Sequence, residues 1–471
     1  MTDLARRARR AASRFLQKWD SGPQHGSAPD IDDNSWKARR FQFQRLYAPA
    51  QQIRLLRILP TTSSDAATDN IACDMRPFDL DEAPPFSALS WAWGSHDFRA
   101  KENIRMNDAA FEVANPALLN ALRHLSRYFL NPTSPPAAPD WLWIDALCIN
   151  QEDMYERGNQ VQLVGIIYAQ ARNVISWLGS GDPAITSAFS FIAETVHAAQ
   201  SSANSLSQIE MLIRCGLDSD APDGAGEDSN ISMDTIVDPR LIYLFSLSND
   251  IPQFFGLEYW HRLWIVQELV LTRPEENIIM YENHTMLFSD IQIFRDSWLG
   301  FLKRLQLLPQ WEASLTKTPG WINIATSWPA YVRTMEDTLI VWSYYDFLRG
   351  VMASGDNLFF IVLSGAYISV DPRDKVFGFL GLASPTAQKQ MGIDYQENPA
   401  ALYTKWFTKV LLDWKSLDPL YFAGLNSRTH SHPMVGLPSW VPDLRRSIRE
   451  SPVWDATLGR TLESMEKGQR F

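Results

Sequence analysis

Two acidic residues lie inside stretches that are otherwise strongly apolar. Asp145 lies in "WLWIDALCI" (residues 141–149), and Glu268 lies in "RLWIVQEL" (residues 262–269). A buried charge costs several kcal/mol unless it is paired or used by a site. A carboxylate beside aromatic rings also tends to have a raised pKa, which suits proton transfer or stabilisation of a developing cation. These two residues are therefore the first candidates for chemistry in this chain.

Asp145 is expected near the end of a buried strand. Alternation places Trp141, Trp143 and Asp145 on one face, and because both faces are apolar the strand should lie in the middle of a covered sheet. The carboxyl ends of such strands are where open α/β sheets bind ligands. One interpretation is a site residue. The other is a structural aspartate that accepts hydrogen bonds from a neighbouring turn or pairs with Arg157.

Glu268 is expected on a helix, at residues 257–271. At 100° per residue it lies about 40° from Trp264 on the helical wheel, at the edge of an apolar stripe. The structural alternative is an ion pair with Arg262, Arg273 or another base at the rim of that helix.

The elements around Asp145 predict a βαβ unit and hence a parallel sheet. Its helix should run from about 151 to 171 with Asn150 as its N-cap, and a strand should follow at 173–179. Glu152, Glu156 and Arg157 are expected on the solvated face of that helix, with Asp153 supporting Arg157.

Other elements follow from local signals. Strands are expected at 53–60 and 86–94, and a hairpin at 104–113 that turns at Asn107 and Asp108. Asn115 should cap a helix that begins at Pro116. Beyond about residue 290 the pattern is mainly helical.

Metal and disulfide chemistry find no support in the sequence. His430 and His432 form an isolated HxH without further ligands, so no metal site is predicted. Cys73, Cys148 and Cys215 give neither a disulfide framework nor a zinc motif, which favours a reducing, cytoplasmic location.

Charge and hydropathy argue against nucleic-acid binding and against a transmembrane helix. The net charge is −11 over 471 residues, which argues against general nucleic-acid binding. No apolar run reaches the length of about 18 residues that would indicate a transmembrane helix. The Arg-rich first residues are interpreted as a solvated tail, with a mitochondrial presequence or a membrane-surface helix as alternatives.

Several segments together resemble fungal heterokaryon-incompatibility (HET) domain proteins. These segments are "FSALSWAWG", "LWIDALCINQEDMYERGNQVQLVGIIYAQARNVISWLG", "RLWIVQELVL", "DPRDKVFGFLGLA" and "LPSWVPD", in the family's order, over about residues 45–445. One departure is Ser-Trp-Ala-Trp-Gly at residues 90–94, where the family usually has Ser-Tyr-Val-Trp-Gly. Many relatives continue beyond "SWVPD", which suggests that a longer C-terminal region is missing.

The expected organisation has four parts. Residues 1–44 are a basic tail and flexible linker, and residues 45–282 are the HET domain, an α/β core with a disordered insertion at about 201–235. Residues 283–445 are a mainly helical C-terminal part, and residues 446–471 are a charged tail.

The resemblance implies a role in nonself recognition and programmed cell death. HET domains are also remotely similar to TIR domains, which implies a TIR/flavodoxin-like parallel sheet core. Some TIR domains cleave NAD with a glutamate in a Trp-x-x-x-Glu motif, and Trp264 and Glu268 match that spacing. The implied site has Glu268 as catalytic residue and Ser90, Trp91, Asp145 and Trp264 as substrate-binding residues, with NAD as substrate and no cofactor.

Two alternatives to an enzyme remain: a non-catalytic module that relays a death signal by assembling with itself and with other incompatibility proteins, and an inactive regulator. An enzyme requires Glu268 in an open pocket near Asp145 or Ser90. A Glu268 that is locked in a salt bridge, with no cavity, would favour the module.

Overall fold

The computed structural model describes residues 35–60, 71–93, 101–130, 141–201, 250–306, 367–415, 417, 419–420 and 434–445. The Arg-rich N-terminal stretch, almost all of the predicted insertion, Cys215, the HxH pair and the charged C-terminal tail lie outside these residues.

One sheet of nine strands organises the described part of the chain, in the order β5-β4-β2-β1-β6-β3-β7-β8-β9. The strands are β1 Gln52–Leu59, β2 Ala72–Asp79, β3 Phe86–Trp91, β4 Glu102–Met106, β5 Ala109–Val113, β6 Trp141–Trp143, β7 Asn173–Trp177, β8 Ile278–Tyr281 and β9 His284–Leu287.

The middle of the sheet is parallel. β3 pairs in parallel with β6 on one side and β7 on the other, and β7 pairs in parallel with β8. In chain order these are β3, β6, β7 and β8, so their spatial order is second, first, third, fourth. That is the flavodoxin-like order, in which ligands bind at the carboxyl ends, where the first and third strands meet. Here that place lies between β3 and β7. The predicted α/β class with a parallel core is confirmed, although β1 and β9 make the whole sheet mixed.

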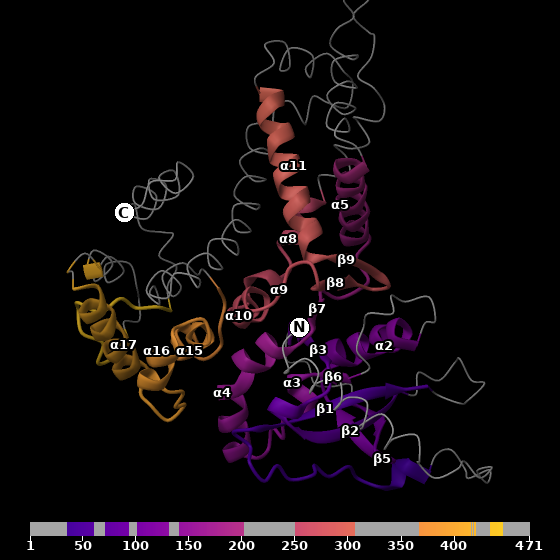
Figure 1. Cartoon of the computed structure of the whole chain (residues 1–471), viewed down its shortest axis with the longest axis horizontal. Coiled ribbons are helices and arrows are strands. Elements are labelled where there is room, and N and C mark those ends of the chain that lie inside the picture. The colour runs from indigo at the N-terminus through magenta and orange to yellow at the C-terminus, as the bar shows by residue number, and fades with distance from the viewer. Residues whose placement is uncertain are drawn as a thin grey trace, which may run out of the picture.

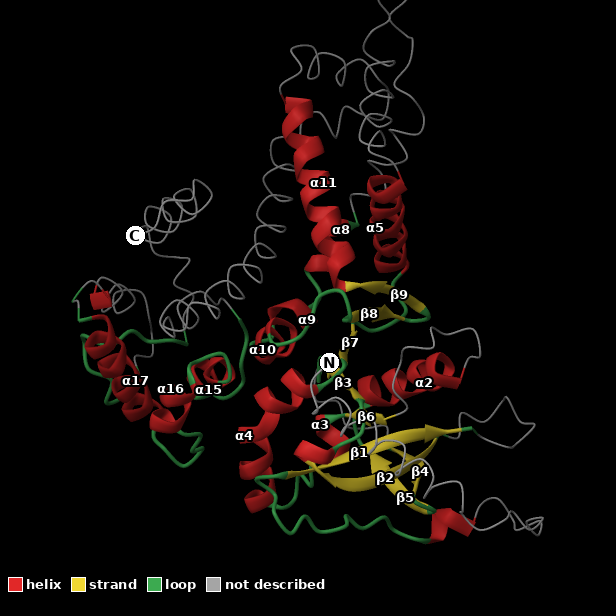
Figure 2. Ribbon diagram, in the orientation of Figure 1, coloured by secondary structure: helices red, strands yellow, loops and turns green. Residues whose placement is uncertain are grey.

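Helices cover the sheet and extend from it. They are α2 Pro116–Leu130, α3 Asp145–Cys148, α4 Met154–Gln170, α5 Pro183–Ser201, α8 Ile251–Phe255, α9 Glu258–His261, α10 Trp264–Val270, α11 Phe288–Gln306, α15 Asp374–Leu380, α16 Pro385–Met391 and α17 Pro399–Trp414, with short 3-10 turns η1 Ser35–Ala38 and η2 Leu80–Glu82. In Figure 1, α5 and α11 pack side by side and project away from the sheet, while α15, α16 and α17 gather beyond α10. Figure 2 shows that the C-terminal group is helical in its described part, as the sequence predicts. None of the described helices has the length and apolar character needed to cross a membrane.

Burial explains why β3 lies in the centre. All six of its residues are buried, as expected for a parallel strand that is covered on both faces. Two serines, Ser87 and Ser90, interrupt the apolar run, and both hydroxyls have hydrogen-bond partners. The two hydroxyl groups inside β3 are therefore already paired.

The prediction of one strand through Asp145 is wrong. β6 ends at Trp143, and Asp145 begins the short helix α3, in which the Ile149 N–H donates to the Asp145 carbonyl. The N-cap of α4 is Asp153 rather than Asn150, since the Asp153 carboxylate accepts from the N–H groups of Tyr155 and Glu156. Asn150 instead accepts from Glu152 N–H, within the preceding turn.

The single helix expected at 257–271 is divided into α9 and α10. Arg262 between them is extended, and a β-bridge joins it to Ile368 from the C-terminal part. Tertiary pairing thus overrides the helical pattern there. In contrast, the hairpin turn at Asn107 and Asp108, which have φ values of 47° and 60°, and the Asn115 cap of α2 are both confirmed.

Candidate functional site

A pocket of about 210 Å³ lies at the carboxyl ends of the central parallel strands. Of the residues predicted for the site, Trp91, Asp145, Trp264 and Glu268 line it. Ser90 is not among the lining residues; it lies buried one position before Trp91 in β3. The structure therefore brings the predicted residues together from segments that are more than 170 positions apart in the chain.

Glu268 is a buried carboxylic acid, with 7% of its surface exposed. Removal from water raises its pKa from 4.5 to about 7, although the nearby positive charge of Arg262 and the hydroxyls of Ser90 and Tyr168 act in the opposite direction. A carboxylic acid with a pKa near 7 exchanges protons readily at neutral pH, which is what general acid/base chemistry requires.

No ion pair holds Glu268 within the described part of the chain. Its Oε2 atom is buried and has no hydrogen-bond partner there. Both suggested basic partners have other contacts, because the Arg262 guanidinium donates to the Trp91 carbonyl and Arg273 lies 3.5 Å from Glu276. The ion pair predicted with Arg262 or Arg273 therefore does not form, although the charge of Arg262 lies close enough to lower the pKa of Glu268.

Asp145 organises two tryptophans at the pocket wall. One carboxylate oxygen accepts from Trp91 Nε1 at 2.9 Å, and the other accepts from Trp93 Nε1 at 3.2 Å. The two indole rings stack, with centroids 5.4 Å apart and an interplanar angle of 17°. Asp145 thus accepts hydrogen bonds from a neighbouring segment, as one alternative predicted, and also lines the pocket. The suggested pair with Arg157 does not form.

Three tyrosines near Glu268 were not predicted for the site. The Tyr259 and Ser90 hydroxyls lie 2.7 Å apart, and Tyr168 donates to the Leu89 carbonyl at 3.0 Å. Tyr395, from the C-terminal part, lines the pocket and donates to Asp374 at 2.7 Å. Tyr168 follows Val161 and Val164 at helical spacing, a signal that could have revealed it. Nothing local in the sequence indicates Tyr395.

Gln267 fixes the short helix that carries Glu268. Its side-chain amide bridges two other elements: it accepts from Gly165 N–H of α4 at 3.1 Å and donates to the Gly378 carbonyl of α15 at 3.0 Å. A Cβ atom at Gly165 or Gly381 would collide with that amide. This bridge therefore ties α10, the helix of seven residues that carries Glu268, to α4 and α15.

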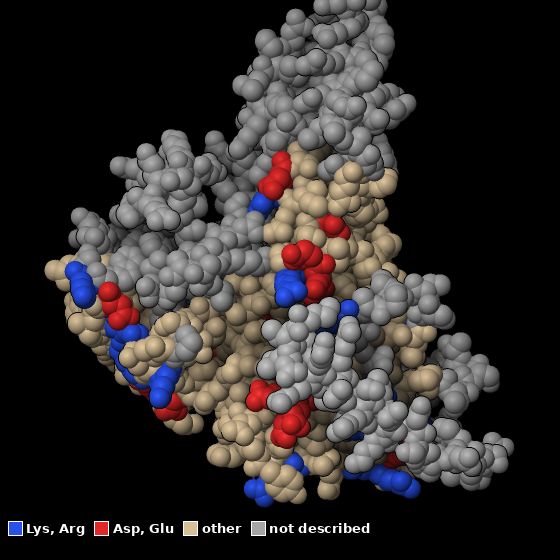
Figure 3. Space-filling view, in the orientation of Figure 1, with Lys and Arg blue, Asp and Glu red and all other residues tan. Residues whose placement is uncertain are grey.

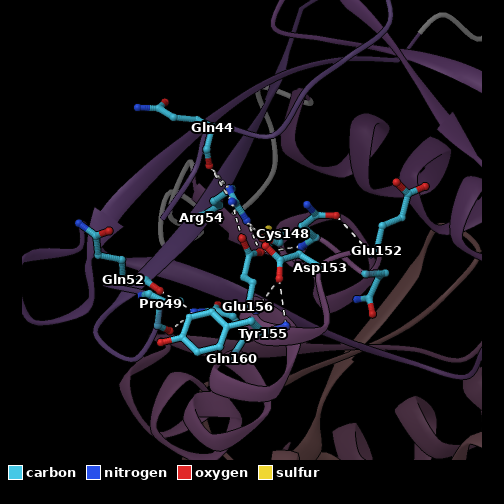
Figure 4. Close-up of polar contacts among 12 residues, drawn as sticks. Gln44, Pro49, Gln52, Arg54, Cys148, Glu152, Asp153, Tyr155, Glu156 and Gln160 are labelled. Atoms are coloured by element: carbon cyan, nitrogen blue, oxygen red, sulfur yellow. Dashed lines mark hydrogen bonds and ion pairs between the residues drawn. The ribbon is translucent and has the colours of Figure 1, made fainter. Parts of the chain in front are cut away.

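A buried ion pair fixes the turn that follows Asp145 (Figure 4). Arg54 of β1 makes two bonds to Glu156 of α4, at 2.6 and 2.8 Å, and donates to the Cys148 carbonyl at 3.1 Å. Glu156 also accepts from Asn150 N–H at 2.8 Å. Residues 148–150 are therefore held at both ends. The predicted solvent exposure of Glu156 is wrong, since only 5% of its surface is exposed.

Metal ligation finds no support in the described residues. They contain no group of three or more His, Cys, Asp or Glu side chains that could hold an ion. Burial raises the pKa of both Cys73 and Cys148 to about 12, so these thiols are poor ligands and nucleophiles at neutral pH.

Comparison with known proteins identifies a family match over part of the chain. The family model described as heterokaryon incompatibility protein (HET) matches residues 86–268. The chain carries a HET domain. The match begins at the first residue of β3 and ends at Glu268, so it encloses Ser90, Trp91, Asp145 and Trp264.

A curated relative supports the same assignment over more of the chain. It is Heterokaryon incompatibility protein 6, OR allele, of Neurospora crassa, which is 23% identical over 453 residues. The alignment covers 88% of this chain but 59% of that relative's length. No solved structure matches the chain. Two residues described above lie outside the matched segment. Tyr395 lines the pocket, and Arg54 holds the turn at residues 148–150.

Proposed function

We propose that this protein acts in fungal heterokaryon incompatibility, in nonself recognition that leads to programmed cell death, and that its HET domain does so by cleaving NAD. The observation that carries the enzymatic part is Glu268: a buried carboxylic acid without an ion-pair partner, in an open pocket beside Asp145. This is the arrangement that an enzyme requires. It is not the arrangement expected of a carboxylate that only stabilises a helix.

Cleavage of NAD requires a negative charge beside the ribose C1′ atom. When the bond between the nicotinamide nitrogen and ribose C1′ breaks, its electron pair goes to the nitrogen, and the ribose becomes an oxocarbenium-like cation. An ionised Glu268 would stabilise that cation, and such preorganised charges are worth about 3–4 kcal/mol in transition states. Water then adds at C1′ and loses a proton, giving ADP-ribose, nicotinamide and H⁺. Since the carboxylate must be ionised, the rate should rise with pH through about 7.

The size of the site suits part of a dinucleotide. Ligand pockets commonly measure about 300–1,000 Å³, and the Glu268 pocket holds about 210 Å³. A second cavity of about 1080 Å³ shares Trp91, Trp93, Ile149 and Gln151 with it as lining residues. The smaller pocket would take the nicotinamide end of the dinucleotide, and the larger cavity offers room for the adenosine end.

Nicotinamide release from NAD by the purified full chain tests the proposal. The wild type should release nicotinamide, and Glu268→Gln should lower the rate by about 100-fold or more. Glu258→Gln is the matched control, because Glu258 is an exposed glutamate on the neighbouring helix α9. Absence of release, even at protein concentrations that favour self-association, would reject the enzyme and favour the non-catalytic signalling module.

A further inference from the structure

Arg157 carries a charge in the pocket that nothing described so far uses. It lies half-buried in the first turn of α4 and lines the pocket with Glu268. Its guanidinium makes no hydrogen bond and no ion pair with the residues that the structure describes. Both acids suggested as partners are occupied, because Asp145 binds the two indoles and Asp153 caps α4. An unpaired cation in a partly buried wall requires another explanation.

Arg157 lies at the end of the pocket wall that is farthest along α4 from Glu268. Arg157, Val161, Val164 and Tyr168 are spaced four, three and four residues apart, so they form one stripe on α4, and all four line the pocket. Eleven residues of helix span about 16 Å. Tyr168 is close enough to Glu268 to influence its pKa, so the stripe leads from Glu268 toward Arg157. A ligand that contacts both ends is longer than a single ring.

The two ends differ in charge. Glu268 lies at one end, and at the other a guanidinium projects from the N-terminal turn of a helix of 17 residues, where the helix dipole favours anions. The acids nearest to it in the chain are Asp153, which caps the helix, and Glu156, which is paired with Arg54. Arg262 also lines the pocket, but its guanidinium donates to the Trp91 carbonyl. A guanidinium fork matches a phosphate by paired N–H···O bonds.

From this arrangement we propose that Arg157 binds a phosphate of a nucleotide whose ribose faces Glu268. The ligand class is therefore a nicotinamide nucleotide rather than free nicotinamide or a nicotinamide nucleoside. This inference rests on the proposed function, because it assumes that the same pocket takes the nicotinamide ribose.

Binding of two probes that differ only in the phosphate tests the proposal. Nicotinamide mononucleotide and nicotinamide riboside are titrated by calorimetry into the full chain carrying Glu268→Gln, so that neither probe is cleaved. The mononucleotide should bind at least tenfold more tightly than the riboside, and this preference should weaken with added salt. Adding Arg157→Gln should abolish the preference and leave riboside affinity within about twofold. Arg127→Gln, at an exposed arginine of α2, should change neither.

Several results would overturn the assignment. Equal affinity for the two probes, no binding of either probe, or a preference that survives Arg157→Gln would each remove Arg157 as the phosphate-binding residue. The proposed function fails by a different measurement. If the wild type releases no nicotinamide from NAD but still prefers the mononucleotide through Arg157, the phosphate site stands and the hydrolase does not.

Discussion

At the scale of single residues, the pKa of Glu268 makes stability depend on pH. Its pKa is raised from 4.5 to about 7 on folding, so the folded state binds this proton more tightly than the unfolded state. Below pH 4.5 Glu268 is protonated in both the folded and the unfolded state, so its raised pKa does not lower the free energy of unfolding. As pH rises from 4.5 to 7 the fold loses stability, and above about 7 the full penalty, at most about 3 kcal/mol, is present.

Glu268→Gln should therefore stabilise the protein at high pH. We expect a gain of up to about 3 kcal/mol in the free energy of unfolding at pH 8, and a much smaller gain at pH 5. Urea denaturation of both variants at the two pH values measures this. Glu258→Gln, which changes an exposed glutamate, is measured alongside as the matched control. A gain from Glu268→Gln that is equal at pH 5 and pH 8 would mean that Glu268 is not the titrating group.

Individual site residues could be predicted from the sequence when their types conflicted with their surroundings. Asp145 and Glu268 were found because a carboxylate is costly in an apolar segment. Glu156 is as buried as Glu268, but it sits among polar neighbours in the sequence, so no local conflict marks it. Its partner Arg54 lies 102 residues away, and a pairing of that separation is invisible to local patterns.

At the scale of elements, the Arg54–Glu156 pair joins β1, α4 and the turn after Asp145. Removing one member leaves the other buried without its partner, which typically costs about 3–5 kcal/mol. We expect Glu156→Gln to destabilise the fold by about that amount, measured by urea denaturation. The exposed pair Lys101–Glu112 gives the control, and Glu112→Gln should cost less than about 1 kcal/mol. Similar losses for the two variants would contradict a structural role for the buried pair.

The bridge made by Gln267 gives a second prediction at this scale. Gly381→Ala would place a methyl group against a side chain that is confined on its other side by Gly165, so the amide has little room to move. We expect a loss of about 1–3 kcal/mol in stability and a lower rate of nicotinamide release, because α10 shifts with Gln267. Gly158→Ala in α4 has open space around it and should be neutral or stabilising. If both variants behave alike, the packing of Gln267 does not position α10.

Elements themselves were predicted well where local signals were strong. The hairpin at Asn107 and Asp108, the Asn115 cap and the strands β1, β3 and β7 follow from turn chemistry and alternation. The errors at α3 and at the break before α10 share one cause. Long-range partners, Arg54 for the first and Ile368 for the second, fix backbone that the local pattern assigns to a regular strand or helix.

At the scale of the whole molecule, the HET match and the folding unit do not coincide. β1 pairs with β2 and with β6, so a strand from outside residues 86–268 lies inside the sheet. A fragment of residues 86–268 would lose that strand, the Arg54 contacts and Tyr395. We expect the fragment to show no cooperative unfolding transition by circular dichroism, whereas a fragment of residues 35–445 should show one. Cooperative unfolding of the shorter fragment would make the matched segment an autonomous domain.

The described surface has no single charged region on the side shown in Figure 3. Lys, Arg, Asp and Glu side chains lie there in small mixed groups between larger neutral areas. Charged groups also lie inside the fold, at the buried pair Arg54 and Glu156 and around Glu268. For these buried charges, the free-energy cost of removal from water depends on whether each one is paired or binds a ligand.

The pocket wall also has an optical consequence. Four of the chain's 18 tryptophans, Trp91, Trp93, Trp143 and Trp264, line the cavity that also contains Glu268. Indole emission is quenched when an electron-poor ring lies against an indole ring, and it shifts when a nearby carboxylic acid ionises. The unlabelled protein thus contains its own fluorophores at the place of interest. Ligand entry and the ionisation of Glu268 would each alter the emitted light, with a time resolution that no extraction of products can reach.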